Sequence, residues 1–197
     1  MDPLVGVLAL QGAFESHQRC FADLGVASRR VRTPADLDGI DALVMPGGES
    51  TTMSKLLLSS GLADPVADLI ARGMPILGTC AGMILLAAEV IGGRDDQISF
   101  SAIDITVQRN GYGRQIDSFE ADLEITSLDG GPFHGVFIRA PQVIRLGPDV
   151  EVLAEHDGVA VLARQGSVTV ASFHPELAGD RRLHAQFVSS MSLTGSI

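Results

Sequence analysis

PILGTCAGMILLAAEV, residues 75–90, contains a short apolar run, a turn and a longer apolar segment. The first part, residues 75–79, is typical of a strand buried on both faces. Residues 81–90 predict a helix that ends at Gly92-Gly93. Cys80 lies between the two elements, with glycines at positions 78 and 82. This G-x-nucleophile-x-G pattern predicts a nucleophile elbow in an α/β fold, with cysteine as the nucleophile.

The predicted elbow explains how Cys80 can be reactive. A tight turn lifts its sulfur off the end of the strand, and the first free N–H groups of the following helix favour a thiolate and a developing oxyanion. The N–H of Ala81 is the expected first oxyanion donor. The alternative is a buried structural cysteine between packing glycines. Cys20 lies on the apolar side of another predicted helix, so we assign it to the core.

The segments before the elbow alternate strands with helices. Helical spacing or apolar length predicts helices near residues 14–24, from Ser50 onward and over residues 62–71. Strands alternating with helices indicate a mostly parallel sheet with right-handed crossovers. The strands are predicted at residues 4–10, 28–32, 41–45 and 75–79.

The segments after the elbow predict shorter strands separated by turns, which extend the sheet or add a small antiparallel layer. A helix is expected over residues 181–191. We expect residues 1–191 to form one domain and residues 192–197 a frayed tail. The short strands are predicted at residues 103–108, 123–125, 135–138, 150–155, 159–164 and 168–173.

The motif His174-Pro175-Glu176 supplies a candidate base and its orienting group, directly after an apolar strand. Residues two apart lie on one side of extended backbone, and Pro175 disfavours helix. The Glu176 carboxylate can bond one ring nitrogen of His174 and leave the other facing Cys80. The alternative is a strand end followed by an ordinary turn.

The other four histidines have weaker claims to catalysis. His17 lies on the apolar side of a helix and is expected at the core or its boundary. His134, His156 and His184 are expected in a loop, a turn and a surface helix. We predict no catalytic role for any of the four.

The Gly-rich segment of residues 46–52, PGGESTT, lies between a strand and a helix. It lacks the lysine and the spacing of a P-loop. We expect it to approach a small substrate and to supply a second oxyanion donor, the N–H of Gly48. Ser50 or Thr51 is a candidate cap of the next helix. The alternative is a plain Gly-rich turn with a cap.

Composition excludes several function classes. The chain has 197 residues, 46% of them apolar, and a formal net charge of −10. It contains no Lys/Arg run, so we expect no nucleic-acid partner. Residues 4–10 are too short to span a membrane or to form a convincing signal peptide, and two cysteines fit a reduced, cytoplasmic protein. No His/Cys cluster has zinc spacing, so we expect no metal and no cofactor.

The elbow at Cys80 and the late Phe173-His174-Pro175-Glu176 together resemble class I (triad) glutamine amidotransferases. Within that class, the chain is similar to the glutaminase subunits of pyridoxal 5′-phosphate synthase, from about residue 4 to 190. The segments that carry the narrower resemblance are Leu10-Gln11-Gly12, residues 46–52, residues 109–115 (RNGYGRQ), residues 117–121 (DSFEA), residues 137–141 (FIRAP) and His174-Pro175-Glu176-Leu177.

The resemblance implies a three-layer, flavodoxin-like fold and a reaction in which Cys80 forms a thioester with L-glutamine. The product ammonia would pass to a (β/α)₈ synthase partner, in assemblies of twelve glutaminases on a synthase dodecamer. Docking would complete the oxyanion hole, with Gln11-Gly12 near the interface. The implied glutamine pocket is lined by Gly48, Glu49, Ser50, Arg109, Ile138 and Arg139.

The chemistry of glutamine fits this pocket. Arg139 or Arg109 can pair with the α-carboxylate, and Glu49 or backbone carbonyls can meet the α-ammonium group.

Three rival functions stay open from the sequence. One is a glutaminase that serves another synthase, such as imidazole glycerol phosphate synthase. A second is a Cys-dependent hydrolase or deglycase of related fold; these usually carry histidine directly after the cysteine, where this chain has Ala81. The third is a binding module that has lost catalysis, which the presence of Cys80, His174 and Glu176 disfavours.

Overall fold

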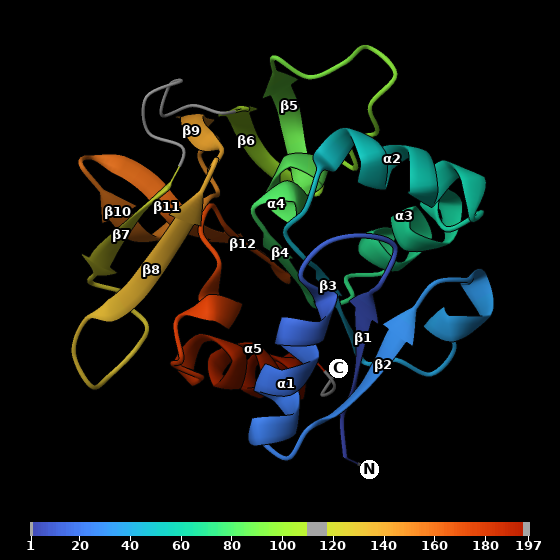
Figure 1. The fold of residues 1–197 in the computed structure, drawn as a ribbon, viewed down its shortest axis with the longest axis horizontal. Coiled ribbons are helices and arrows are strands. Elements are labelled where there is room, and N and C mark those ends of the chain that lie inside the picture. Colours follow the sequence, from blue (N-terminus) through green and yellow to red (C-terminus); the bar gives the residue numbers. More distant parts are fainter. Residues whose placement is uncertain (1, 110–117, 195–197) are drawn as a thin grey trace.

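The computed structural model describes residues 2–109 and 118–194, with side chains described to residue 191. Its centre is a seven-stranded sheet in the order β10-β11-β12-β4-β3-β1-β2 (Figure 1). All neighbours from β12 to β2 are parallel, whereas β10, β11 and β12 pair antiparallel. The strands are β1 (Leu4–Leu8), β2 (Ala27–Val31), β3 (Ala42–Met45), β4 (Ile76–Thr79), β10 (Glu151–His156), β11 (Val159–Gln165) and β12 (Val168–Ala171).

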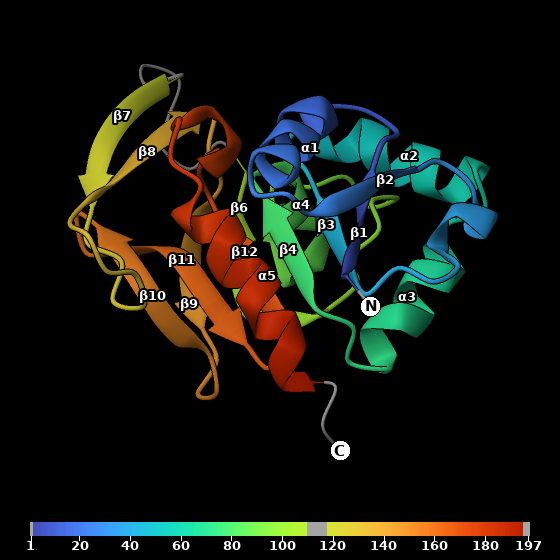
Figure 2. The ribbon, with the colours of Figure 1, turned by 90° about the horizontal axis from the view of Figure 1, so that it is seen from below.

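Helices cover both faces of this sheet, which makes three layers (Figures 1 and 2). On one face, Phe21 and Phe187 pack against alternate residues of β1 and β3. On the other face, Met53, Leu57 and Val66 pack against the intervening residues. The first face carries α1 (Phe14–Asp23) and α5 (Arg182–Thr194), and the second carries α2 (Ser50–Ser59), α3 (Ala63–Ala71) and α4 (Ala81–Leu86).

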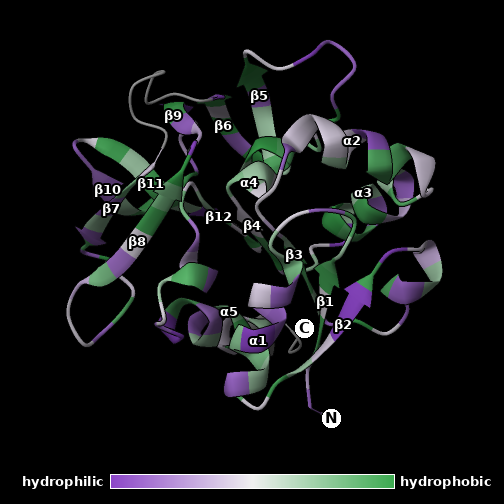
Figure 3. Cartoon of the chain, in the orientation of Figure 1, coloured by the Kyte–Doolittle hydropathy of each residue, from purple (hydrophilic) through white to green (hydrophobic). Residues whose placement is uncertain are grey.

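Hydropathy follows the position of each strand in the sheet (Figure 3). Every residue of β3 and β4 is buried, as expected of central strands that are covered on both faces. The edge strand β2 carries Arg29 and Arg30 and is only partly buried. Charged residues on an edge strand disfavour pairing with another chain.

Two smaller sheets complete the structure. β5 (Ala87–Ile91), β6 (Ile103–Gln108) and β9 (Gln142–Leu146) form a three-stranded sheet, and β7 (Ser118–Leu123) pairs with β8 (Phe133–Ile138). The β7–β8 ribbon is held by aromatic packing: Phe133 and Phe137 lie 5.9 and 5.6 Å from Phe173 between ring centroids. Short 3₁₀ helices occur at Pro34–Leu37 and Pro175–Leu177.

The structure confirms the predicted α/β fold, with a mostly parallel sheet and an antiparallel extension. The predicted helix over residues 81–90 is wrong in its second half, because α4 ends at Leu86 and residues Ala87–Ile91 form β5. Ala87 is already extended, at φ −61° and ψ 151°, and β5 pairs in parallel with β6. The hydrogen bonds that β6 offers therefore outweigh the helix preference of an Ala- and Leu-rich segment.

Other boundaries also differ from the expectation. Strand β9 was not predicted, and the strand predicted at residues 123–125 lies earlier, at Ser118–Leu123. The last helix runs to Thr194, three residues beyond the expected end at residue 191. Within the ranges that the structure describes, no helix is both long and apolar enough to cross a membrane.

Candidate active site

Cys80 occupies the predicted elbow between β4 and α4. Its backbone has φ 48° and ψ −101°, a conformation that non-glycine residues rarely adopt. The glycines at the elbow are required by close packing. A Cβ atom at Gly82 would overlap the carbonyl oxygen of Met45, and one at Gly78 would lie 2.9 Å from the carbonyl carbon of Gly82. The strand, the turn and the start of the helix predicted around Cys80 are therefore confirmed.

His174 and Glu176 lie at the end of β12, the strand beside β4. His174 Nδ1 is 2.8 Å from Glu176 Oε1, and the backbone N–H of His174 donates to the carbonyl of Val136 at 2.8 Å. A Cβ atom at Gly47 would overlap the His174 ring and lie 3.3 Å from Cys80 Cβ. Gly47 therefore covers the point where the nucleophile and the base meet.

The electrostatics favour the charged forms of His174 and Glu176. Burial acts to lower the pKa of His174, but hydrogen bonds to Cys80 and to Glu176 outweigh it and raise that pKa to about 10. Burial acts to raise the pKa of Glu176, yet His17 and His174 hold it below its ordinary value. A protonated His174 beside an ionised Glu176 is thus favoured in this arrangement.

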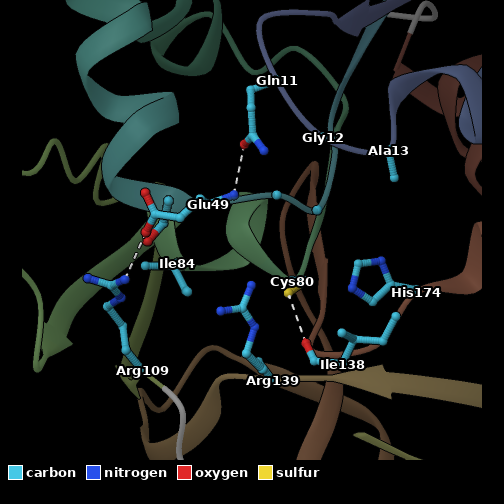
Figure 4. A pocket seen from close by; sticks show the side chains of 13 residues that line it. Gln11, Gly12, Ala13, Glu49, Cys80, Ile84, Arg109, Ile138, Arg139 and His174 are labelled. Atoms are coloured by element: carbon cyan, nitrogen blue, oxygen red, sulfur yellow. Dashed lines mark hydrogen bonds and ion pairs between the residues drawn. The ribbon is translucent and has the colours of Figure 1, made fainter. Parts of the chain in front are cut away.

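Cys80 and His174 open onto one cavity of about 310 Å³ (Figure 4). This volume lies at the lower end of the range for small-molecule sites. The structure brings together in its wall all six residues of the predicted glutamine pocket: Gly48, Glu49, Ser50, Arg109, Ile138 and Arg139. Five further lining residues were not assigned to the pocket from the sequence: Gln11, Gly12, Ala13, Gly47 and Ile84. Of these, Gln11, Gly12 and Gly47 lie within motifs that the sequence singles out.

The loop after β3 is held against the loop after β1. The N–H of Ala13 donates to the carbonyl of Gly47 at 2.9 Å, and the N–H of Glu49 donates to Gln11 Oε1 at 2.8 Å. A trans peptide directs its C=O and N–H to opposite sides. The N–H of Gly48 therefore points away from Ala13, on a residue that lines the cavity beside Cys80.

Glu49 caps α2, so the expectation of Ser50 or Thr51 as the cap is wrong. The Glu49 carboxylate accepts from the backbone N–H of Thr52 at 2.7 Å and of Thr51 at 3.4 Å, and from both threonine hydroxyls. Partial burial acts to raise the Glu49 pKa, but these hydrogen bonds lower it to about 2. A glutamate serves here because its longer side chain reaches both free N–H groups of the first turn.

The two predicted pocket arginines differ in their partners. Arg109 Nη2 forms an ion pair with Glu49 Oε1 at 3.0 Å. Arg139 directly follows β8 at φ 43°, and its guanidinium points toward the space in front of Cys80 (Figure 4). Among the residues that the structure describes, Arg139 has no hydrogen-bond or ion-pair partner. Most of the predicted segment 109–115, along with residue 117, lies outside the described residues.

Ser50 also lines the cavity, and its hydroxyl is buried. Within the described part of the chain, the Ser50 Oγ atom has no hydrogen-bond partner. Since Glu49 takes the capping role, the Ser50 hydroxyl is not used as the cap of α2.

The structure corrects the expected places of three histidines. His184 was expected on a helix surface but is fully buried, and His134 and His156 lie in strands β8 and β10 rather than in a loop and a turn. His17 is in the core as expected, although its Nε2 also lies 3.3 Å from Glu176 Oε2. The buried position predicted for Cys20 is confirmed.

The described side chains include no cluster of three or more His, Cys, Asp or Glu that could hold a metal ion. The cavity instead joins a thiol, an imidazole with its carboxylate, and arginine. That set can attack a carbonyl group and bind a carboxylate.

Comparison with known proteins gives consistent results. The profile of the SNO glutamine amidotransferase family matches residues 7–193. The chain is 54% identical over 188 residues to the "Pyridoxal 5'-phosphate synthase subunit PdxT" of Mycobacteroides abscessus, covering 95% of this chain and 97% of that one. It is 52% identical over 191 residues to the subunit of that name from Pelotomaculum thermopropionicum, covering 97% and 96%.

Solved structures agree with these sequence relatives. A crystal structure of a glutamine amidotransferase superposes with a TM-score of 0.90 at 48% identity, covering 95% of this chain and 98% of that one. PurLQS from Thermotoga maritima superposes with a TM-score of 0.69 at 16% identity, which shows likeness of fold alone.

Proposed function

Because the chain belongs to the SNO glutamine amidotransferase family, we propose that Cys80, His174 and Glu176 hydrolyse L-glutamine to L-glutamate and ammonia. The observation that carries this proposal is the elbow geometry: a strained Cys80 opens onto the same cavity as a His174 that Glu176 orients at 2.8 Å. Nucleophile, base and orienting group are the three parts that covalent acyl transfer requires.

In the first half-reaction, the thiolate of Cys80 attacks the side-chain amide carbon and an S–C bond forms. Negative charge moves to the amide oxygen, where the N–H groups of Ala81 and Gly48 donate to it. The C–N bond then breaks as His174 protonates the leaving nitrogen, which departs as ammonia. The enzyme is left as a thioester of glutamate.

In the second half-reaction, His174 takes a proton from water as the water oxygen attacks the thioester carbon. The same N–H groups stabilise the second oxyanion. The S–C bond breaks, glutamate leaves, and Cys80 returns to its thiolate beside the protonated His174. Glu176 stabilises the imidazolium in both halves, since its pKa lies below the ordinary range and keeps it ionised.

Substrate recognition divides between two arginines. Arg139, which has no partner among the described residues, binds the α-carboxylate of glutamine. Arg109 holds Glu49 through their 3.0 Å ion pair. Glu49 then presents its backbone and carboxylate to the α-ammonium end, while Ser50 and Ile138 complete the wall. The Arg109–Glu49 ion pair favours Arg139 over Arg109 as the anion site.

The ammonia passes to a partner. Ammonia released to water at neutral pH would be protonated and would lose its nucleophilicity. Relatives that are 52–54% identical carry the name pyridoxal 5′-phosphate synthase subunit. We therefore expect a (β/α)₈ synthase subunit that consumes ammonia in making pyridoxal 5′-phosphate, with twelve glutaminases on a synthase dodecamer. Residues 1–191 act as one glutaminase domain, and two free cysteines support a cytoplasmic setting.

Glutamate release from L-glutamine, with and without the synthase subunit, tests the function. We expect synthase-dependent release that falls by at least about 10³-fold in Cys80→Ala, because no other group supplies the thioester. Size-exclusion chromatography with the synthase is the control, since Cys80→Ala should still bind it. Full activity in a folded Cys80→Ala protein would refute the mechanism.

A further inference from the structure

A buried set of polar groups lies behind the triad, on the side of Glu176 away from His174. His17 of α1 has no exposed surface, and its Nε2 lies 3.3 Å from Glu176 Oε2 and 3.2 Å from Thr79 Oγ1. Its Nδ1 lies 2.9 Å from Nε2 of His184, which is also fully buried, in α5. Helices α1 and α5, which cover the same face of the sheet, thus each contribute one histidine. The two histidines form a line of polar contacts that ends at the Glu176 carboxylate.

The chemistry of the groups fixes the direction of the hydrogen bonds. An ionised Glu176 can only accept, so a His17 that bonds it must carry the hydrogen on Nε2. A neutral His17 then accepts at Nδ1, and the Nε2–H of His184 must donate to it. Burial, against the pull of Glu176, lowers the pKa of His17; burial and the neighbouring His17 lower that of His184 to about 3. Both rings are therefore neutral, as this direction requires.

His17 is the donor within reach of the second oxygen of Glu176. His17 Nε2 forms its hydrogen bond with Thr79 Oγ1 at 3.2 Å, and Glu176 Oε2 lies beside the same nitrogen at 3.3 Å, longer than an ideal hydrogen bond. Glu176 Oε2 is buried and has no hydrogen-bond partner of good geometry among the described residues, so His17 Nε2 at 3.3 Å is the side-chain group that can supply a donor to it. A buried carboxylate without a donor tends to turn toward another partner or to take up a proton.

We propose that His17 is a positioning residue of the catalytic triad, with His184 fixing its tautomer. The Nε2–H of His17 holds Oε2 of Glu176, so that Oε1 stays aimed at His174. A neutral donor orients the carboxylate without cancelling its charge, and that charge remains available to the imidazolium of His174. This inference rests on the proposed function, because it assigns His17 to the triad that hydrolyses glutamine.

The other charged and polar groups around His17 and His184 have partners or positions of their own. Besides Glu176 and His174, the groups that act on the two buried histidines include Arg181, which precedes α5. Arg181 pairs with Asp23 at the end of α1, at 2.9 Å. The thiol of Cys20 lies 3.9 Å from the backbone carbonyl of Glu176. None of these groups lies within hydrogen-bond reach of Glu176 Oε2, so His17 is the residue to change.

Alkylation of Cys80 by iodoacetamide, followed against pH, provides a test that needs no glutamine. The Cys20→Ala background leaves Cys80 as the single thiol. His17→Leu removes the donor and His17→Gln keeps an N–H near the same place. His134→Leu is the matched control, since His134 also lies beside carboxylates, those of Glu120 and Asp122, but on the exposed β7–β8 ribbon.

We expect His17→Leu to move the alkylation midpoint to higher pH and to slow alkylation near neutral pH by about 10- to 100-fold, the effect of losing one hydrogen bond to a charged group. His17→Gln should recover most of the loss, and His134→Leu should match the parent. A folded His17→Leu protein with the parent's midpoint would overturn the proposal. So would equal losses in His17→Leu and His17→Gln, since those indicate packing alone.

Glutaminase kinetics with the synthase give a second readout. His17→Leu should lower kcat by a similar factor while KM changes by less than about twofold, because His17 does not line the cavity. A loss confined to KM would contradict a positioning role. If the wild type releases no glutamate, the proposed function fails, whereas the alkylation comparison still decides the role of His17.

His184→Phe covers the case in which His17→Leu does not fold. The variant keeps a ring against Phe21, which lies 5.3 Å away between ring centroids, and removes only the donor to His17. We expect a smaller shift of the alkylation midpoint in the same direction. An unchanged midpoint in folded His184→Phe would remove His184 from the proposal, and with it the argument for the tautomer of His17.

Discussion

At the scale of single residues, Cys80 shows why a reactive side chain sits in an unfavourable backbone conformation. A positive φ at a residue with a Cβ atom costs on the order of 1–3 kcal/mol, and glycine, which would relieve this strain, carries no thiol. The strain at φ 48° is maintained because the neighbouring glycines allow β3, β4 and α4 to pack closely around it. Position and reactivity of the sulfur are thus produced by the same turn.

Arg139 carries a prediction about substrate binding. Arg139→Ala should raise KM for glutamine by about 10- to 100-fold and change kcat little, because a charge-assisted contact to a part of the substrate that does not react is lost. Steady-state glutamate release measures both constants. Arg145→Ala is the matched control, since Arg145 pairs with Asp104 outside the cavity. A selective loss of kcat in Arg139→Ala would place this residue in the chemical step instead.

At the scale of elements, α4 and β5 show the limit of local pattern. An apolar segment rich in Ala, Leu and Ile satisfies both a helix and a buried strand. The segment divides at Ala87 because β6 offers parallel pairing from there, while the N–H groups of Phe100 and Ala102 satisfy the carbonyls of Leu85 and Leu86. These partners lie farther along the chain, so no window around residue 87 contains the deciding contacts.

Gly82 carries a prediction about the packing of α4 on β3. In Gly82→Ala the new Cβ overlaps the carbonyl of Met45, which is backbone and cannot turn aside. The free energy of unfolding should fall by about 3 kcal/mol, the upper part of the range for overpacking. Urea denaturation measures it. Gly25→Ala has a positive φ but open space around it, so it should cost only about 1 kcal/mol. Equal losses in the two variants would refute the packing argument.

At the scale of the whole molecule, the site is assembled from the carboxyl ends of neighbouring strands. Cys80 follows β4, His174 follows β12, and Gly48 follows β3; these three strands are adjacent in the sheet. In an open parallel sheet this edge is where ligands bind. The helices of the opposite layer then add the buried histidines behind Glu176, so the site depends on all three layers of the fold.

The lowered pKa values of those buried histidines lead to a prediction of how the free energy of unfolding depends on pH. Burial and His17 lower the pKa of His184 from 6.5 to about 3, so the unfolded chain binds a proton in this interval that the folded chain does not. The stabilisation is present above pH 6.5 and is lost as pH falls toward 3, by about 1.4 kcal/mol per pH unit. Urea unfolding at about pH 7.5 and 5.5 should show this loss of unfolding free energy. The loss between the two pH values should be smaller in His184→Phe. Equal slopes in both proteins would contradict the prediction.

Local sequence was enough to predict the parallel strands, the elbow at Cys80 and the pairing of His174 with Glu176. Each depends on residues close along the chain: buried strands as apolar runs, a turn between glycines, and two side chains two residues apart. The chain's resemblance to class I glutaminases also identified six residues that line the cavity.

Tertiary structure alone decided where the helix after Cys80 ends, which residue caps α2, which of the two arginines pairs with Glu49, and what lies behind Glu176. Each of these depends on a contact between residues far apart in sequence. Arg109 is engaged because Glu49 lies beside it, and His17 reaches Glu176 because α1 packs against the 3₁₀ helix Pro175–Leu177. Hydropathy alone predicts that a histidine such as His184 lies at the surface. Its burial is favourable because His17, a buried polar residue far away in sequence, provides a hydrogen-bond partner.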